Sequence, residues 1–330
     1  MATRAEAGKV DRPLFPLEIR VARPRPAAFA LVFALLAFGA APPVRALAQT
    51  VHHGVAPTPD GEIGYEILGV RGAAVPVIAV NGGPGLSHVY MVQNDLWARV
   101  ARKRLVVLYD QRGTGASRHM RPGAAQTLEA QVADLEAVRA TLKLDKVALV
   151  GDSFGGFVSM AYAAAHPEHV ARLVLSDSPP PAMKDMVHLL PQSFPDVEAA
   201  DAEEQKGLSP DAAARASLRN HFRMIFYSPA RRDAYMARMG DLGYEPAVGR
   251  AMSKAIAGVD MTEQVKRFTG FPTLVLSGRY DMNVAPLTAW NIAHLIPGAK
   301  LEFFEESSHL PSYEEPVKYQ RVLEAFLDAP

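Results

Sequence analysis

The sequence contains no cysteine in its 330 residues. This absence excludes disulfide bonds, thiolate metal sites, a cysteine nucleophile and a lipid-modified cysteine anchor. The chain also lacks an excess of either charge, because 35 Lys and Arg residues balance 35 Asp and Glu residues. An even balance gives no indication of nucleic acid or an anionic membrane surface as a partner.

Motifs for metals and nucleotides are missing as well. The ten histidines show neither H-x-x-x-H nor H-E-x-x-H spacing, and no acidic loop of the calcium-binding type occurs. The glycine-rich stretches match neither G-x-G-x-x-G nor G-x-x-x-x-G-K-[ST]. We therefore expect no metal site and no nucleotide cofactor.

The first 48 residues are typical of a secretory signal peptide. Arginines precede an uncharged apolar run at 27–41, and Ala46 and Ala48 form an A-x-A cleavage pattern. The run is shorter than the ~20 apolar residues of a membrane span. The sequence predicts cleavage after Ala48, a secreted or periplasmic mature chain, and no stable membrane association after cleavage. The alternative is an uncleaved N-terminal anchor.

Short apolar runs alternate with helical patterns in the rest of the chain, which predicts an α/β fold with a mostly parallel central sheet flanked by helices. The expected strands are 63–69, 75–80, 104–110, 146–151, 171–177, 272–278 and 300–306, and the clearest helices are 128–142 and 316–327. The alternation stops once, over a helical stretch. We therefore predict a core at 49–178 and 263–330, with a helical cap at 179–262.

A candidate nucleophile follows the expected strand 146–151. The stretch "GDSFGG" fits G-x-S-x-G, with Ser153 between two glycines that allow a sharp turn from strand to helix. Such a turn presents the serine hydroxyl at its apex. It also leaves the backbone amide of Phe154 at a helix N-terminus, where it can stabilise an oxyanion.

Another glycine-rich loop, "NGGPG" at 81–85, follows the strand 75–80. In this position the N–H group of Gly83 can supply the second oxyanion donor. A plain tight turn is the simpler interpretation, but a turn seldom needs three glycines in five residues.

A serine nucleophile needs a base and an acid that orients the base. His309 follows the last expected strand, which is where the chain order Ser, Asp, His places the base. Two aspartates end strands before it, Asp177 and Asp281. The same order favours Asp281 as the orienting acid, and Asp177 is the alternative.

Five motifs in order, "NGGPG", "LYDQRGTGAS", "GDSFGG", "GRYDMNVAP" and "SSHLPSYEEP", resemble the proline iminopeptidase family of α/β-hydrolases. The resemblance covers about residues 55–328 outside the cap. It implies an α/β-hydrolase fold with a helical cap and a serine peptidase that removes N-terminal residues from short peptides. It also implies Ser153 as nucleophile, Asp281 as acid, His309 as base, and the amides of Gly83 and Phe154 as the oxyanion hole.

The chain departs from the family pattern at three places. Asn81 stands where the family usually has histidine, and Phe154 where tryptophan is common. The cap also lacks the W-x-x-W-E motif, whose glutamate binds the free amine of the substrate in proline-specific members. Candidate substitutes for that glutamate are Glu203, Glu204 and Glu245.

Three functions are therefore compared. The first is an exported aminopeptidase of proline iminopeptidase type. The second is a carboxylesterase or lactonase that uses the same triad on a neutral acyl group. It would have an apolar cap pocket formed by Met183, Met186, Phe222, Met224, Phe226 and Tyr227. The third, a non-catalytic binding protein, would require a broken triad, and all three members are present. The partner is a small peptide or ester.

Overall fold

The computed structural model describes residues 51–330 and contains one eight-stranded sheet, in the order β1-β2-β4-β3-β5-β6-β7-β8. Strands β3 to β8 run parallel, whereas β2 pairs antiparallel with both β1 and β4. The strands are β1 (His52–Thr58), β2 (Gly61–Leu68), β3 (Val77–Val80), β4 (Val106–Tyr109), β5 (Val147–Asp152), β6 (Val170–Ser176), β7 (Thr273–Gly278) and β8 (Lys300–Phe304). The predicted fold class is confirmed.

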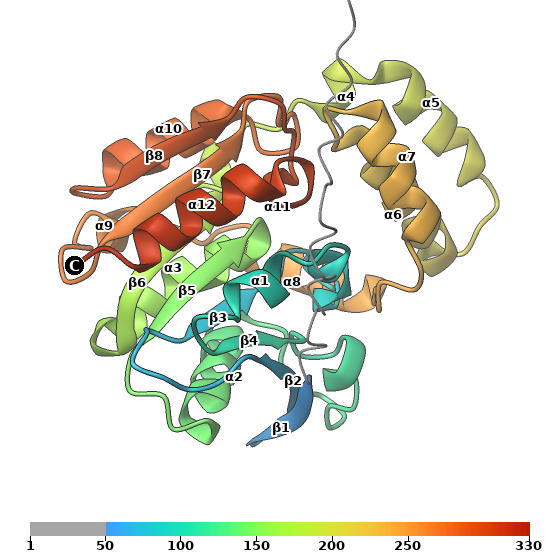
Figure 1. Ribbon diagram of the computed structural model, residues 1–330. Coiled ribbons are helices and arrows are strands. Elements are labelled where there is room, and N and C mark those ends of the chain that lie inside the picture. The colour runs from blue at the N-terminus through green and yellow to red at the C-terminus, as the bar shows by residue number, and fades with distance from the viewer. Residues whose placement is uncertain (1–50) are drawn as a thin grey trace, which may run out of the picture. The chain divides into compact units, whose positions relative to one another are not determined.

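Helices cover both faces of the sheet (Figure 1). They are α1 (Leu96–Val100), α2 (Leu128–Thr141), α3 (Phe154–Ala165), α10 (Pro286–Leu295), α11 (Pro311–Glu314) and α12 (Pro316–Leu327). Helices α2, α3 and α10 share a buried apolar cluster with one face, and α1 and α12 share a second cluster with the other. Adjacent strand residues enter opposite clusters, as Ile78 and Ala79 do, because side chains alternate across a strand.

Between β6 and β7 the chain is helical. This stretch contains α4 (Leu190–Ser193), α5 (Pro195–Glu204), α6 (Pro210–Met224), α7 (Pro229–Arg238), α8 (Pro246–Ile256) and α9 (Thr262–Val265). Helices α5, α6 and α7 lie together, apart from the helices that flank the sheet (Figure 1). A third apolar cluster, which includes Phe222, Ile225 and Tyr235, joins this region to Leu86 and Tyr90 on the sheet side.

Short 3-10 helices complete the fold: η1 (His88–Val92), η2 (Gly115–Ser117), η3 (Pro167–His169) and η4 (Met183–Asp185). The predicted signal peptide, residues 1–48, lies outside the described residues. Within 51–330, no helix combines the length and the apolar character that crossing a bilayer requires.

Candidate active site

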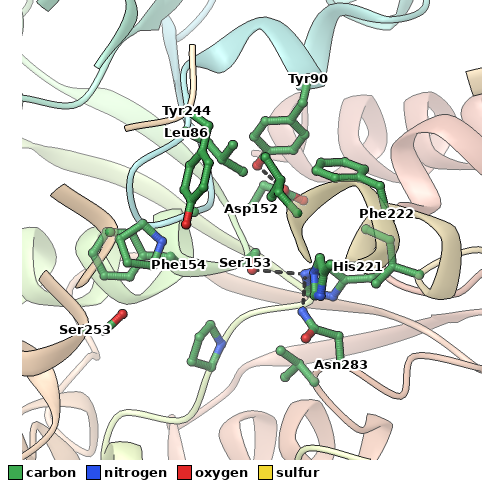
Figure 2. A pocket seen from close by; sticks show the side chains of 18 of the residues that line it. Leu86, Tyr90, Asp152, Ser153, Phe154, His221, Phe222, Tyr244, Ser253 and Asn283 are labelled. Atoms are coloured by element: carbon green, nitrogen blue, oxygen red, sulfur yellow. Dashed lines mark hydrogen bonds between the residues drawn. The ribbon is translucent and has the colours of Figure 1, made fainter. Parts of the chain in front are cut away.

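Ser153 lies on the sharp turn between β5 and α3. Its backbone has φ of 51° and ψ of −124°, a conformation that non-glycine residues rarely adopt. The flanking glycines permit this turn. A Cβ on Gly155 would lie 2.0 Å from the carbonyl oxygen of Val80, and one on Gly151 would lie 2.5 Å from that of Gly155. The turn therefore needs glycine on both sides and directs the serine side chain into a cavity (Figure 2).

His309 joins Ser153 to Asp281. Its Nε2 atom lies 3.0 Å from Ser153 Oγ, and its Nδ1 atom lies 2.7 Å from Asp281 Oδ2. Asp281 is held in turn by its Oδ1 atom, which accepts hydrogen bonds from the amides of Asn283 and Val284. Burial lowers the pKa of His309, but the charge and hydrogen bond of Asp281 outweigh burial and raise it above its usual value. The structure thus brings together all three predicted triad residues.

Asp177, the alternative acid, lies close to Asp281 and His309 but forms its hydrogen bonds with other residues. Its Oδ1 atom accepts from the Gly278 amide, and Ser176 Oγ donates to its Oδ2 atom. Burial raises the pKa of Asp177 well above its usual value, and the charge of Asp281 adds to this effect. Asp177 thus keeps its own backbone and side-chain donors, and the carboxylate in contact with the imidazole of His309 is that of Asp281.

Ligand atoms of Asp177, Asp281 and His309 all lie within 4.8 Å of one another, close enough in principle to hold a cation. However, Asp281 uses one oxygen for two backbone amides and the other for the imidazole. A metal would have to displace the Nδ1 proton that joins His309 to Asp281. The donor set therefore fits a shared proton better than a metal ion.

The predicted oxyanion donors lie at the same cavity. Gly83 and Phe154 both line it. Within residues 51–330 neither backbone amide donates a hydrogen bond, so both are available to an anion beside Ser153. Asn81 supports the loop, because its Nδ2 atom donates to the carbonyls of Gly82 and Leu86.

The cavity has a volume of about 570 Å³ and lies between the strand ends and helices α6 and α8. Of the six predicted apolar residues, three line it: Met183, Met186 and Phe222. The other three lie elsewhere. Met224 is buried in the third apolar cluster, Phe226 packs against Tyr235, and the exposed Tyr227 stacks on Tyr280.

None of the three predicted cap carboxylates lines the cavity. Glu203 is exposed and paired with Lys206. Glu204 is exposed and accepts a hydrogen bond from Asn220, and Glu245 is partly exposed with Arg215 at 3.5 Å. The structure therefore does not bring these acids to the nucleophile.

The polar residues at the cavity that were not predicted include Tyr90, Asp152, His221 and Asn283. Asn283 Nδ2 lies 3.0 Å from His309 Nε2, the atom that also faces Ser153. Burial lowers the pKa of His221 to about 3, and the nearby His309 adds to this effect, so its imidazole is neutral. Asp152 occupies an unspecified position of the G-x-S-x-G motif, so the motif gave no signal for it.

An ionic cluster of His88, Asp110 and Glu66 includes the first residue of η1, which follows the glycine loop 81–85 closely in the chain. His88 Nδ1 lies 2.8 Å from Asp110 Oδ1, and its Nε2 atom lies 3.4 Å from Glu66. Burial lowers the pKa of His88, but these carboxylates outweigh burial and raise it to about 9. The side chain of Gln111 donates to the Asn81 carbonyl, which connects this region to the oxyanion loop.

A family model described as the alpha/beta hydrolase fold matches residues 75–316. Together with the Ser-His-Asp chain, this match defines the protein as a serine hydrolase of the α/β-hydrolase fold. A proline iminopeptidase from Lactobacillus delbrueckii subsp. bulgaricus is 31% identical over 277 residues, which cover 79% of this chain and 92% of the relative. Another from Saccharolobus solfataricus is 30% identical and covers 80% and 88%. The chain belongs to the proline iminopeptidase family.

Solved structures agree on the fold. An esterase from Rhodococcus sp. ECU1013 superposes with a TM-score of 0.68 at 23% identity, covering 84% of this chain and 98% of the esterase. At that identity the likeness concerns the architecture alone.

Proposed function

We propose that this hydrolase is an aminopeptidase of proline iminopeptidase type, which releases N-terminal residues from short peptides through an acyl-enzyme on Ser153. The observation that carries the proposal is the unbroken chain Ser153–His309–Asp281 at the wall of a cavity covered by helices. The relatives described as proline iminopeptidases support the peptide substrate.

In the proposed reaction, Ser153 Oγ attacks the carbonyl carbon of the first peptide bond while His309 Nε2 accepts the hydroxyl proton. Asp281 keeps the imidazole proton on Nδ1, so that Nε2 is free to accept. The amides of Gly83 and Phe154 stabilise the oxyanion. Loss of one such donor typically costs about 3–4 kcal/mol of transition-state stabilisation.

The tetrahedral intermediate then collapses. His309 returns the proton to the departing amine, and the N-terminal residue remains as an ester on Ser153. Water, activated by the same imidazole, hydrolyses this ester and restores the serine. The cavity volume of about 570 Å³ suits one or two residues rather than a long chain.

A carboxylesterase or lactonase is the second candidate. The observation that favours it is the absence of the three predicted cap carboxylates from the cavity, whose lining includes Met183, Met186 and Phe222. Such a lining suits a neutral acyl group, which needs no partner for an amine.

One set of assays distinguishes the two candidates. Residues 49–330 are tested against L-proline p-nitroanilide, its N-acetyl derivative and p-nitrophenyl acetate. We expect the anilide to be cleaved, and cleavage to be lost when the amine is acetylated. Ester hydrolysis without cleavage of any free-amine anilide would refute the aminopeptidase and leave the esterase.

Export is part of the proposal and rests on the sequence of residues 1–48 alone. Expression of the full chain in a bacterial host should yield a periplasmic protein that begins at Gln49. A product that keeps its N-terminus in the membrane fraction would indicate an uncleaved anchor instead.

A further inference from the structure

A carboxylate that no motif assigns lies directly beside the nucleophile. Asp152 is the only acidic residue that lines the cavity within residues 51–330. The residue is 4% exposed, and its Oδ2 atom lies 2.5 Å from the Tyr90 hydroxyl. Its Oδ1 atom accepts no hydrogen bond from the described residues, yet it is not among the fully enclosed unpaired atoms. One carboxylate oxygen is therefore available at the cavity.

We propose that Asp152 binds the protonated N-terminal amine of the substrate, the role for which Glu203, Glu204 and Glu245 were the candidates from the family resemblance. The inference rests on the proposed aminopeptidase activity and names the residue that makes that activity selective. An aminoacyl amine is two bonds from the carbonyl carbon that Ser153 attacks. Its partner must therefore lie at the cavity close to the nucleophile. Asp152 precedes Ser153 in the chain and lines the same cavity, whereas the cap acids do not line it.

The charge of Asp152 has no cationic partner in the described residues. No Lys or Arg forms an ion pair with it, and the one arginine at the cavity, Arg250, pairs with Asp211 at 2.6 Å. Burial raises the pKa of Asp152 to about 6, and the nearby His309 and the Tyr90 hydroxyl limit the rise. The carboxylate is thus mostly ionised at neutral pH, and a buried unpaired charge gains from a ligand cation.

Asp152 also has a structural contact that a test must separate from charge. The Tyr90 hydroxyl, which donates to Asp152, accepts the Gly82 amide at 2.5 Å. Asp152→Asn keeps an oxygen for Tyr90 and removes the charge, so it isolates amine binding. Tyr90→Phe does the opposite, because it keeps the charge and removes the hydroxyl.

The test is calorimetric titration of L-prolinamide and N-acetyl-L-prolinamide into protein carrying Ser153→Ala, which does not turn over. Hydrogen bonds to a charged group predict that the free amine binds about tenfold or more tightly than the acetylated one. Adding Asp152→Asn should reduce this preference to about twofold or less. Adding Glu245→Gln, the matched control, or Tyr90→Phe should leave the preference in place.

A preference that survives Asp152→Asn would overturn the proposal, and so would the lack of any preference with Asp152 intact. Loss of the preference in Tyr90→Phe would show that the preference depends on the Tyr90 hydroxyl and not on the charge of Asp152, and would also overturn the proposal. This arm of the test can be read even if the Asp152→Asn protein fails to fold. The proposed function fails separately, when protein with Ser153 intact does not cleave L-proline p-nitroanilide.

Discussion

Asp281→Asn is the substitution that most directly tests the triad. The amides of Asn283 and Val284 donate to Oδ1 of Asp281, at 2.8 and 2.9 Å. In the variant these two donors require an oxygen at that position, so the new NH₂ group must face His309 Nδ1. The imidazole can then only accept at Nδ1, and its proton moves to Nε2. An imidazole protonated at Nε2 cannot take the proton of Ser153.

The size of the effect follows from this tautomer. Forcing the wrong tautomer in a Ser-His-Asp triad lowers kcat by about 10⁴, which corresponds to about 5 kcal/mol of transition-state stabilisation. Asp177→Asn is the matched control. Because Asp177 bonds to the Gly278 amide and the Ser176 hydroxyl and not to the imidazole, its replacement by an amide should change kcat by less than about tenfold.

The assay compares kcat for p-nitrophenyl acetate across the wild type, both single variants and the double variant, with circular dichroism to confirm folding. The double variant should be as slow as Asp281→Asn alone. Near-normal turnover in Asp281→Asn, lost only when Asp177 is also replaced, would refute the reasoning. It would assign the orienting role to Asp177.

Three further predictions follow from the same geometry. Ser153→Ala should abolish labelling by a fluorophosphonate, and retained labelling on this chain would identify a different nucleophile. Asn283→Ala removes a hydrogen-bond donor that favours the neutral form of His309. The variant imidazole should therefore protonate more readily, and the acid limb of the kcat/KM profile should move up by about 0.5–1 pH unit. An unchanged or lower midpoint would contradict this. The pKa of His88 is raised from 6.5 to about 9, so its stabilising effect is complete below pH 6.5 and lost as the pH rises through 9. Urea unfolding should show a loss on the order of 3 kcal/mol over that range, which His88→Gln should largely remove.

The sheet and the triad were predictable because their signals are local. Ser153 and Asp281 follow continuous apolar runs and His309 follows the last strand, and parallel strands bring their carboxyl ends to one edge of the sheet. The structure accordingly places all three within hydrogen-bonding distance. Strand β1 was missed because its only fully buried residue is Ala56, so its sequence shows no apolar alternation.

The substrate side of the site was not predictable in the same way. The contact between Tyr90 and Asp152 joins residues 62 positions apart, and Tyr90 lies on the short helix η1, which has no strong pattern. Glu203 and Glu204 lie at the C-terminal end of α5, and Glu245 is the N-cap residue of α8. Which face of such a helix turns toward the cavity depends on packing between helices, and a single sequence does not specify that packing.

The Tyr90 hydroxyl connects Asp152, the proposed amine-binding residue, with the glycine loop 81–85. It donates to Asp152 and accepts from the Gly82 amide, and Gly82 precedes Gly83, the proposed oxyanion donor. A cation bound at Asp152 would attract the same carboxylate that accepts from this hydroxyl, so we expect the proposed amine binding to be coupled to the position of the loop. Removing the hydroxyl should then affect turnover of every acyl substrate, whereas removing the charge of Asp152 should act chiefly on substrates with a free amine. This difference separates a residue that shapes the oxyanion hole from one that selects the substrate.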